Sequence, residues 1–173
     1  MKAVKKIFNG IFVFMTYFAI VQLLAMTLIV STQVFCRYVL NFSISWVEEV
    51  ALILMVWFSL IAMAIGVKKK LHFSIVLFTS KLSERVLNNV IRRITDVCCI
   101  LFSFVLIYYG YLLMINGLMS TLPATGLPTS VEYIFAPISG VLIAYDSIMD
   151  LFGIDKQDKE FDRLIEGGEP THA

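Results

Sequence analysis

The chain has 173 residues and a formal net charge of +1, and 59% of its residues are apolar whereas 16% are charged. A soluble domain carries about a quarter charged residues, so this composition argues against a water-soluble enzyme or carrier. No part of the chain is basic enough to form a nucleic-acid-binding domain.

Charged residues are absent from residues 7–36, 50–67 and 97–131. Apolar runs of about 18 or more residues are long enough to cross a bilayer as helices, which satisfy their own backbone hydrogen bonds in lipid. We therefore predict an all-α membrane protein with a transmembrane domain over residues 1–152, whose four helices cover about 11–37, 46–67, 94–117 and 131–152. A polar cytoplasmic tail is expected over residues 153–173.

The first predicted helix follows Lys2, Lys5 and Lys6, an arrangement that also begins a secretory signal peptide. Its apolar stretch is longer than the 7–15 residues of a signal peptide, and no small-residue cleavage site closes it. We expect it to remain as the first membrane span. Gln22 and Gln33 within it are predicted to hydrogen-bond another helix.

The second helix begins at the segment SISWVEEV, where Ser45 and Glu48 have the spacing of a capping box. Glu48 and Glu49 lie in the first turn, where the helix dipole favours negative charge, and Trp46 is typical of the membrane interface. This interpretation makes the residues structural anchors. We expect Arg37, which ends the first helix, to pair with Glu49, and Arg37 and Glu48 to brace the first two helices.

A second interpretation of the same segment is a subunit contact. Trp46 and Trp57 share one helical face within about 20°, and Glu49 lies roughly 60° from it. Tryptophan is favoured at the centres of protein interfaces. Trp46, Glu49 and Trp57 are therefore candidates for a subunit interface, beside their alternative role as anchors.

The basic loop after the second helix mixes lysines with apolar residues over about 68–82. Such a segment is predicted to lie in the headgroup plane, with the lysines on phospholipid phosphates. Its lipid and interface anchors are predicted to be Lys68, Lys69, Lys70 and His72, with the lysines reaching the surface by snorkelling.

Ionisable residues near the ends of the third and fourth helices are predicted to form a salt-bridged cytoplasmic rim. Arg92 and Asp96 have the i, i+4 spacing of a helical ion pair. Asp146 and Asp150 share a face of the fourth helix and require cations, for which Arg92 and Arg93 are candidates.

The outer loop before the fourth helix is rich in turn residues. Thr129 and Glu132 again have capping-box spacing. Pro137 and Gly140 are expected to kink or loosen the fourth helix.

Lysine and arginine counts predict the orientation. The N-terminal segment has three, the first loop one, the second loop seven, the third loop none and the tail three. Positive residues remain in the cytoplasm, so both termini and the second loop are expected there.

The order of these motifs resembles the small membrane subunit of tripartite ATP-independent periplasmic (TRAP) transporters, the DctQ-like family. The resemblance covers about residues 10–150 and rests on Arg37-Tyr38, SISWVEEV, Trp57, GVKKKLHF and LPATGLPTSVEYIFAP. Leu71 departs from the family pattern, where a glycine is common before the histidine; this weakens any special role for His72.

The resemblance implies a scaffold in a bacterial inner membrane. A large multi-span transporter subunit would carry the sodium and organic-acid sites, and a periplasmic substrate-binding protein would deliver a carboxylate such as a dicarboxylic or sialic acid. This chain would be a rigid bundle that braces the large subunit.

Two other classes of protein are alternatives. An independent four-helix exporter would use Asp146 as its coupling site, but the middle of the first span carries Gln22 and no acid. An enzyme is not expected, because no nucleophile and base are arranged together. Cys36, Cys98 and Cys99 are interpreted as small apolar helix residues, and no metal or cofactor is expected.

Overall fold

The computed structural model describes residues 2–69 and 92–151. Four of its helical segments are long and apolar enough to cross a membrane, which confirms the predicted fold class. Lys70, His72, the remainder of the expected interfacial segment and the tail 153–173 lie outside the described residues, as does the side chain of Arg92.

The first two helices form an antiparallel pair. Helix α1 runs from Lys2 to Val39 and α2 from Ser45 to Lys68. With 38 residues, α1 is about 57 Å long, much longer than a hydrocarbon core of roughly 30 Å. Asn41 adopts a left-handed backbone with φ 52°, and the N–H of Phe42 donates to the Cys36 carbonyl over 3.1 Å. The left-handed residue thus turns the chain back so that a carbonyl of the last helical turn is satisfied.

The third and fourth spans are each interrupted near the loop that joins them. Helix α4 covers Arg92–Asn116 and continues into the 3₁₀ turn η3, Gly117–Met119. The fourth span consists of α5, Ser130–Tyr133, and α6, Phe135–Leu151. The expected kink therefore lies at Ile134, because Pro137 has no N–H to donate to the carbonyl of Tyr133.

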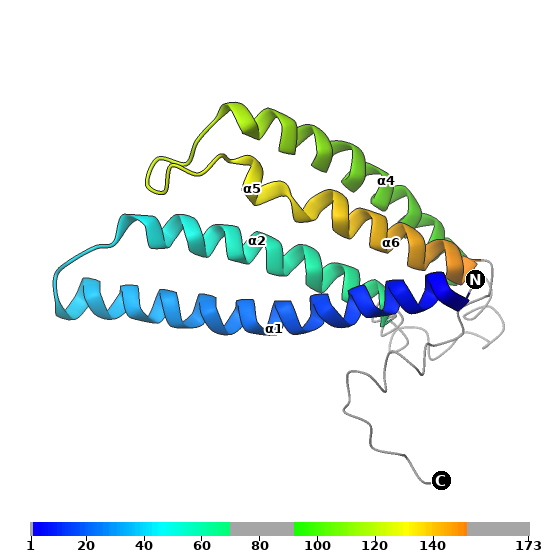
Figure 1. The fold of residues 1–173 in the computed structure, drawn as a ribbon, viewed down its shortest axis with the longest axis horizontal. Coiled ribbons are helices and arrows are strands. Elements are labelled where there is room, and N and C mark those ends of the chain that lie inside the picture. The colour runs from blue at the N-terminus through cyan, green and yellow to red at the C-terminus, as the bar shows by residue number, and fades with distance from the viewer. Residues whose placement is uncertain (1, 70–91, 152–173) are drawn as a thin grey trace, which may run out of the picture.

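The four spans form an open row. Figure 1 places α1 and α4 at opposite edges, with α2 and α6 between them. The main packing pairs are α4 with α6, α1 with α2, and α2 with α6. The N-terminal half of α1 also reaches α6, where the rings of Phe8 and Tyr145 stack with centroids 3.6 Å apart.

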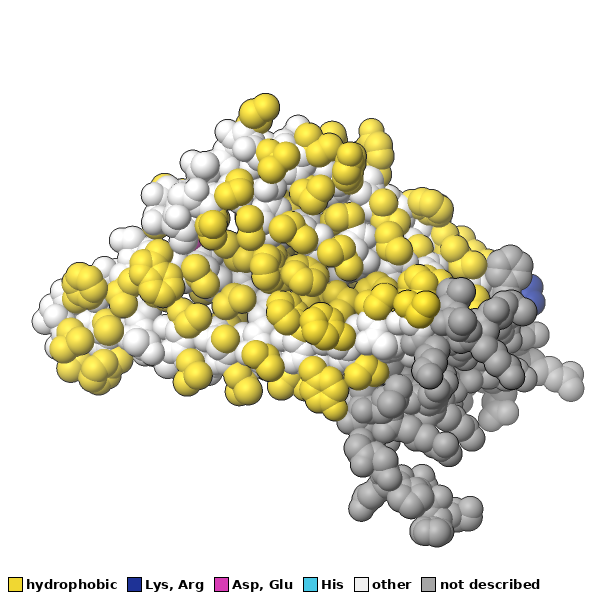
Figure 2. Space-filling view, viewed as in Figure 1, with side chains coloured by type: hydrophobic (Ala, Val, Ile, Leu, Met, Phe, Trp, Pro, Cys, Tyr) yellow, Lys and Arg dark blue, Asp and Glu magenta, His cyan; other side chains and the backbone are white. Residues whose placement is uncertain are grey.

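The hydrophobic core lies where α1, α2 and α6 meet. Its buried members are Phe12, Met15, Ala19, Ile61, Ala64, Leu142 and Ile143. Elsewhere apolar side chains face outward, and Figure 2 shows them spread across the visible face of the whole row. A surface of this kind is typical of a protein surrounded by lipid or by other membrane helices.

Helix α4 packs on α6 through small or polar residues at every seventh position. Asp96, Ser103, Gly110 and Gly117 are all buried, and this spacing is that of a left-handed helix pair. At Gly110 an added Cβ would lie 2.8 Å from the Cβ of Ala136. The close approach of the two helices therefore depends on the missing side chain.

Gly117→Ala is expected to destabilise the chain by about 1–3 kcal/mol, the usual cost of overpacking. The new Cβ would lie 2.6 Å from the backbone nitrogen of Ser130, where α5 begins. Gly10→Ala is the matched control, because no atom lies within 4 Å of a Cβ placed there. Equilibrium unfolding by SDS in mixed micelles measures both variants, and equal stability of the two would contradict this account.

Candidate functional site

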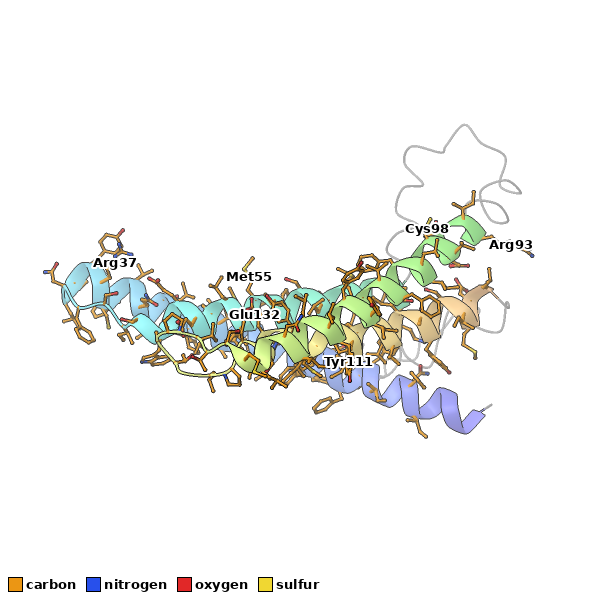
Figure 3. The ribbon with its side chains drawn as sticks, turned by 90° about the horizontal axis from the view of Figure 1, so that it is seen from above. Arg37, Met55, Arg93, Cys98, Tyr111 and Glu132 are labelled. Atoms are coloured by element: carbon orange, nitrogen blue, oxygen red, sulfur yellow. The ribbon has the colours of Figure 1, made fainter. Side chains whose placement is uncertain are left out.

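Two groups of polar side chains lie at different levels along the row. One level surrounds Glu49 and the loop between η3 and α5, and the other surrounds Lys68 and the C-terminal part of α6. They are named below the Glu49 end and the Lys68 end. In Figure 3, Arg37 lies in α1 toward the Glu49 end, and Arg93 lies at the start of α4 toward the Lys68 end.

At the Glu49 end, one carboxylate holds the outer loop. Glu49 Oε1 accepts from the N–H of Ala124 over 2.7 Å. Its Oε2 accepts from the N–H and the hydroxyl of Thr125, each over 2.8 Å. Hydrogen bonds to a charged acceptor are stronger than those between neutral groups. Glu49 is therefore a clamp between α2 and the loop.

The loop has a compact internal structure that suits this clamp. The N–H groups of Leu122 and Gly126 donate to the carbonyls of Leu127 and Leu122 respectively, each over 2.8 Å. Gly126 has φ +71°, a conformation that glycine adopts without the cost imposed by a Cβ. The turn directs its two amides at Glu49.

Glu49 does not pair with Arg37 as expected, because its oxygens are used by the loop. The link between α1 and α2 at this end is instead a hydrogen bond of 3.2 Å from Gln33 Nε2 to Glu48 Oε1. Arg37 is exposed in the last turn of α1, where the helix dipole favours a positive charge. Glu48 thus contacts the first helix through Gln33.

Neither predicted capping box forms. Helix α2 begins at Ser45 with Ile44 as its N-cap, and no side chain caps its first turn. Thr129 occupies the N-cap position of α5, but its hydroxyl donates to the carbonyl of Ser120 over 3.2 Å. The loop uses this hydroxyl to close itself, which leaves none for the helix.

Trp57 joins α2 to the fourth span in the interior. Its indole N–H donates to the carbonyl of Val131 over 2.9 Å, and its ring lies 4.9 Å from that of Phe135. The bond satisfies a carbonyl at the break between α5 and α6. Trp57 and Glu49 thus face this chain's own loop and fourth span, while Trp46 remains 48% exposed.

Gln22 forms a further internal bond, as predicted for the first span. Its Nε2 donates to the carbonyl of Leu54 over 2.6 Å. The bond crosses from α1 to α2 within the apolar part of both helices, where few other groups compete for it.

At the Lys68 end, a buried ion pair joins α2 to α6. Lys68 Nζ lies 3.1 Å from Asp146 Oδ1, and the two side chains are 2% and 6% exposed. The ammonium also lies 5.3 Å from the centroid of the Phe12 ring, a cation–π distance. Lys68 is therefore no lipid anchor, because it pairs with Asp146 in the interior. The predicted pairing of Asp146 with Arg92 involves a side chain outside the described part of the chain, and Arg93 is exposed.

Other polar residues are buried at the same end. Asn9, Asp96 and Asp150 come from α1, α4 and α6, and each is at most 7% exposed. Lys69, next to Lys68, is exposed. The Lys68 end thus combines a buried polar network with one lysine that faces outward.

The arrangement contains no metal centre within the described residues: no group of three or more His, Cys, Asp or Glu side chains is placed to hold an ion. Of the interactions described above, those at both ends link helices or loops of this one chain. These contacts therefore have a structural role: they fix the relative positions of α1, α2, α6 and the outer loop.

Residues 26–156 match the sequence pattern of the family described as tripartite ATP-independent periplasmic transporters, DctQ component. The chain is 25% identical over 156 residues to the sialic acid TRAP transporter small permease protein SiaQ of Vibrio cholerae, covering 90% of this chain and 88% of that protein. It is 25% identical over 119 residues to a putative TRAP transporter small permease protein of Haemophilus influenzae, covering 69% and 73%.

A third relative is a longer protein. The isethionate TRAP transporter permease protein DctMQ of Oleidesulfovibrio alaskensis is 26% identical over 144 residues, which cover 79% of this chain and 22% of that protein.

Proposed function

Because the chain belongs to the DctQ family of TRAP transporter components, a family of multi-pass inner-membrane transport subunits and not of enzymes, we propose that it braces a large transport subunit without carrying cargo itself. The family works with such a large membrane subunit, and in DctMQ the part similar to this chain is 22% of a longer permease protein. The proposed brace is the open row of α1, α2, α6 and α4.

One observation carries the proposal: the buried polar contacts connect parts of this chain. The Lys68–Asp146 pair joins α2 to α6, and Gln22 joins α1 to α2. A coupling acid must bind and release its ion, which a buried ammonium at 3.1 Å opposes. This disfavours the alternative of an exporter that uses Asp146.

The proposed orientation puts the Lys68 end in the cytoplasm and the Glu49 end in the periplasm. The distribution of lysine and arginine supports it. Glu49 and Trp57 would support the outer face by holding the loop and the fourth span in place, and exposed Trp46 would contact the membrane interface or the large subunit directly.

The proposed transport reaction is sodium-driven import of an organic acid delivered by a periplasmic binding protein. The names of two relatives support an organic anion as cargo, since they specify sialic acid and isethionate. The substrate of this system would be selected by the large subunit and the binding protein.

Reconstitution tests the proposal directly. Proteoliposomes that contain the large subunit, the cognate binding protein and this chain are expected to take up a radiolabelled organic acid when a sodium gradient is applied. Omitting this chain should reduce the initial uptake rate about tenfold, which corresponds to about 1.4 kcal/mol in the activation free energy. Proteoliposomes with this chain alone should show no uptake above protein-free vesicles, and uptake by them would contradict the scaffold function.

A further inference from the structure

Helix α4 presents three tyrosines away from the rest of the described chain. Tyr108, Tyr109 and Tyr111, named here the tyrosine face, are 66%, 55% and 56% exposed. The first two rings meet edge to face with centroids 5.2 Å apart. Between them in sequence lies Gly110, which faces α6, so the tyrosines occupy the flanks and the outer side of the helix.

The tyrosine face lies at the middle of the membrane. On α2, the charged groups of Glu49 and Lys68 are nineteen residues apart, or about 28 Å along a helix, which matches the hydrocarbon thickness. Trp57 is near the midpoint of this interval and contacts Phe135.

The middle of α4 lies at the same depth in the membrane as Trp57. Phe135 precedes Ala136, which contacts Gly110 of α4. Figure 3 likewise shows Tyr111 in the central part of the row, between Arg37 and Arg93.

A phenol hydroxyl at this depth requires a partner. In hydrocarbon a hydroxyl without a hydrogen bond is costly, and tyrosine is enriched at the membrane surfaces, where its hydroxyl meets water. From mid-membrane the surface is about 15 Å away, beyond the reach of the side chain. No hydrogen bond joins these three hydroxyls to a described residue of this chain.

On α1, the other edge helix, threonine hydroxyls are satisfied by the backbone of the same helix. Thr16, Thr27 and Thr32 each donate to the carbonyl four residues earlier, over 2.8 Å. A tyrosine hydroxyl is too far from its own backbone to do the same. The described middle of α1 therefore carries one outward phenol, Tyr17, whereas α4 carries three within four residues, and lipid tails satisfy none of these hydroxyls.

We propose that the tyrosine face of α4 is the surface that binds the large subunit. The partner is a transmembrane helix that offers carbonyl, amide or hydroxyl oxygens at mid-membrane as acceptors for the phenol hydroxyls. This hydrogen-bond complementarity selects protein over lipid, because acyl chains supply no acceptor. The inference rests on the proposed function and adds to it the face by which the brace is attached.

Site-specific photocrosslinking tests the assignment on the intact complex. A benzophenone amino acid replaces Val105 or Leu112, which are exposed and flank Tyr108 on the same side of α4. The full chain is co-expressed with its large subunit and irradiated in membranes. Both positions are expected to give a crosslink to the large subunit, identified by mass spectrometry. The control is Leu24 on α1, which is 60% exposed and should give none.

Three results would overturn the assignment: crosslinks from Leu24 and none from α4, crosslinks from α4 to lipid alone, or crosslinks from α4 to a second copy of this chain alone. These results can be distinguished from a failure of the proposed function. If uptake depends on this chain while α4 fails to crosslink to the large subunit, the function stands and the face is wrong; if uptake is independent of the chain, the scaffold itself is wrong.

Removal of the hydroxyls alone provides a second test. The triple variant Tyr108→Phe, Tyr109→Phe, Tyr111→Phe keeps the rings and is expected to weaken the affinity between the subunits in detergent about tenfold. Tyr17→Phe on α1 is the matched control and should change the affinity less than about twofold. Unchanged affinity in the triple variant would show that the hydroxyls bind no partner.

Discussion

Replacing Lys68 by methionine is expected to lower the free energy of unfolding by about 3–5 kcal/mol, the cost of leaving a buried charge without its partner. Methionine preserves most of the length and the apolar contacts of the side chain. Asp146, 6% exposed and 3.1 Å from the removed ammonium, would lose its partner on α2. The measurement is SDS unfolding of the purified chain in mixed micelles.

Two further variants make this result specific. Lys69→Met removes the neighbouring exposed lysine and should change stability by less than about 0.5 kcal/mol. The double variant Lys68→Met, Asp146→Asn removes both charges, and it should recover more than half of the loss because the two residues are coupled. If the double variant is less stable than Lys68→Met alone, the ion pair is not the cause.

Replacing Glu49 by alanine is expected to release the outer loop. The amides of Ala124 and Thr125 donate to Glu49 over 2.7 and 2.8 Å, and hydrogen bonds to a charged acceptor are stronger than those between neutral groups. Water reaches this loop and replaces part of the lost bonding. We therefore expect a local loss of stability, which raises hydrogen exchange at these two amides severalfold.

The neighbouring glutamate is the control for this experiment. Glu48→Ala removes a single bond, from Gln33, and should leave exchange at Ala124 and Thr125 unchanged. Glu49→Gln is expected to resemble Glu49→Ala, since the new amide nitrogen is a donor that faces donors. Equal exchange in Glu49→Ala and the unaltered chain would show that the loop holds itself.

The positions of the helices follow from the sequence because the membrane fixes their length. The second span was predicted over 46–67 and is found over Ser45–Lys68; the two ends are set by the charges of Glu49 and Lys68. The break at Ile134 was placed less well. Proline removes a bond to the residue four positions earlier, so the helix opens ahead of Pro137 and not at it.

The sequence does not reveal which groups the charged residues bind. Lys68 lies at the end of α2 and Arg93 at the start of α4, at the same level of the row. Which of them pairs with Asp146 depends on how α2 is rotated against α6. Glu49 binds backbone amides of a loop that is 75 residues away in sequence. Backbone groups are the same in every residue, so no pattern of side chains identifies them.

Two residues of the predicted stripe on α2 make contacts within this chain, and the subunit contact remains a prediction for the stripe. Trp57 and Glu49 meet the fourth span and the loop of the same chain. The indole N–H of Trp57 binds the backbone carbonyl of Val131, a partner that no pattern of side chains identifies; a buried indole N–H usually has such a partner.

The open row has a consequence for how such proteins diverge. Only narrow seams between adjacent helices are tightly constrained in shape. Outside the tyrosine face of α4, the broad outward surfaces require only that a side chain be apolar. Random exchange among leucine, isoleucine, valine and phenylalanine would go unnoticed over most of the molecule. An architecture of this kind retains its form while identity falls to the 25% seen across species, and a saturation mutagenesis map would show thin lines of intolerance along the helices where a globular protein shows a compact intolerant centre.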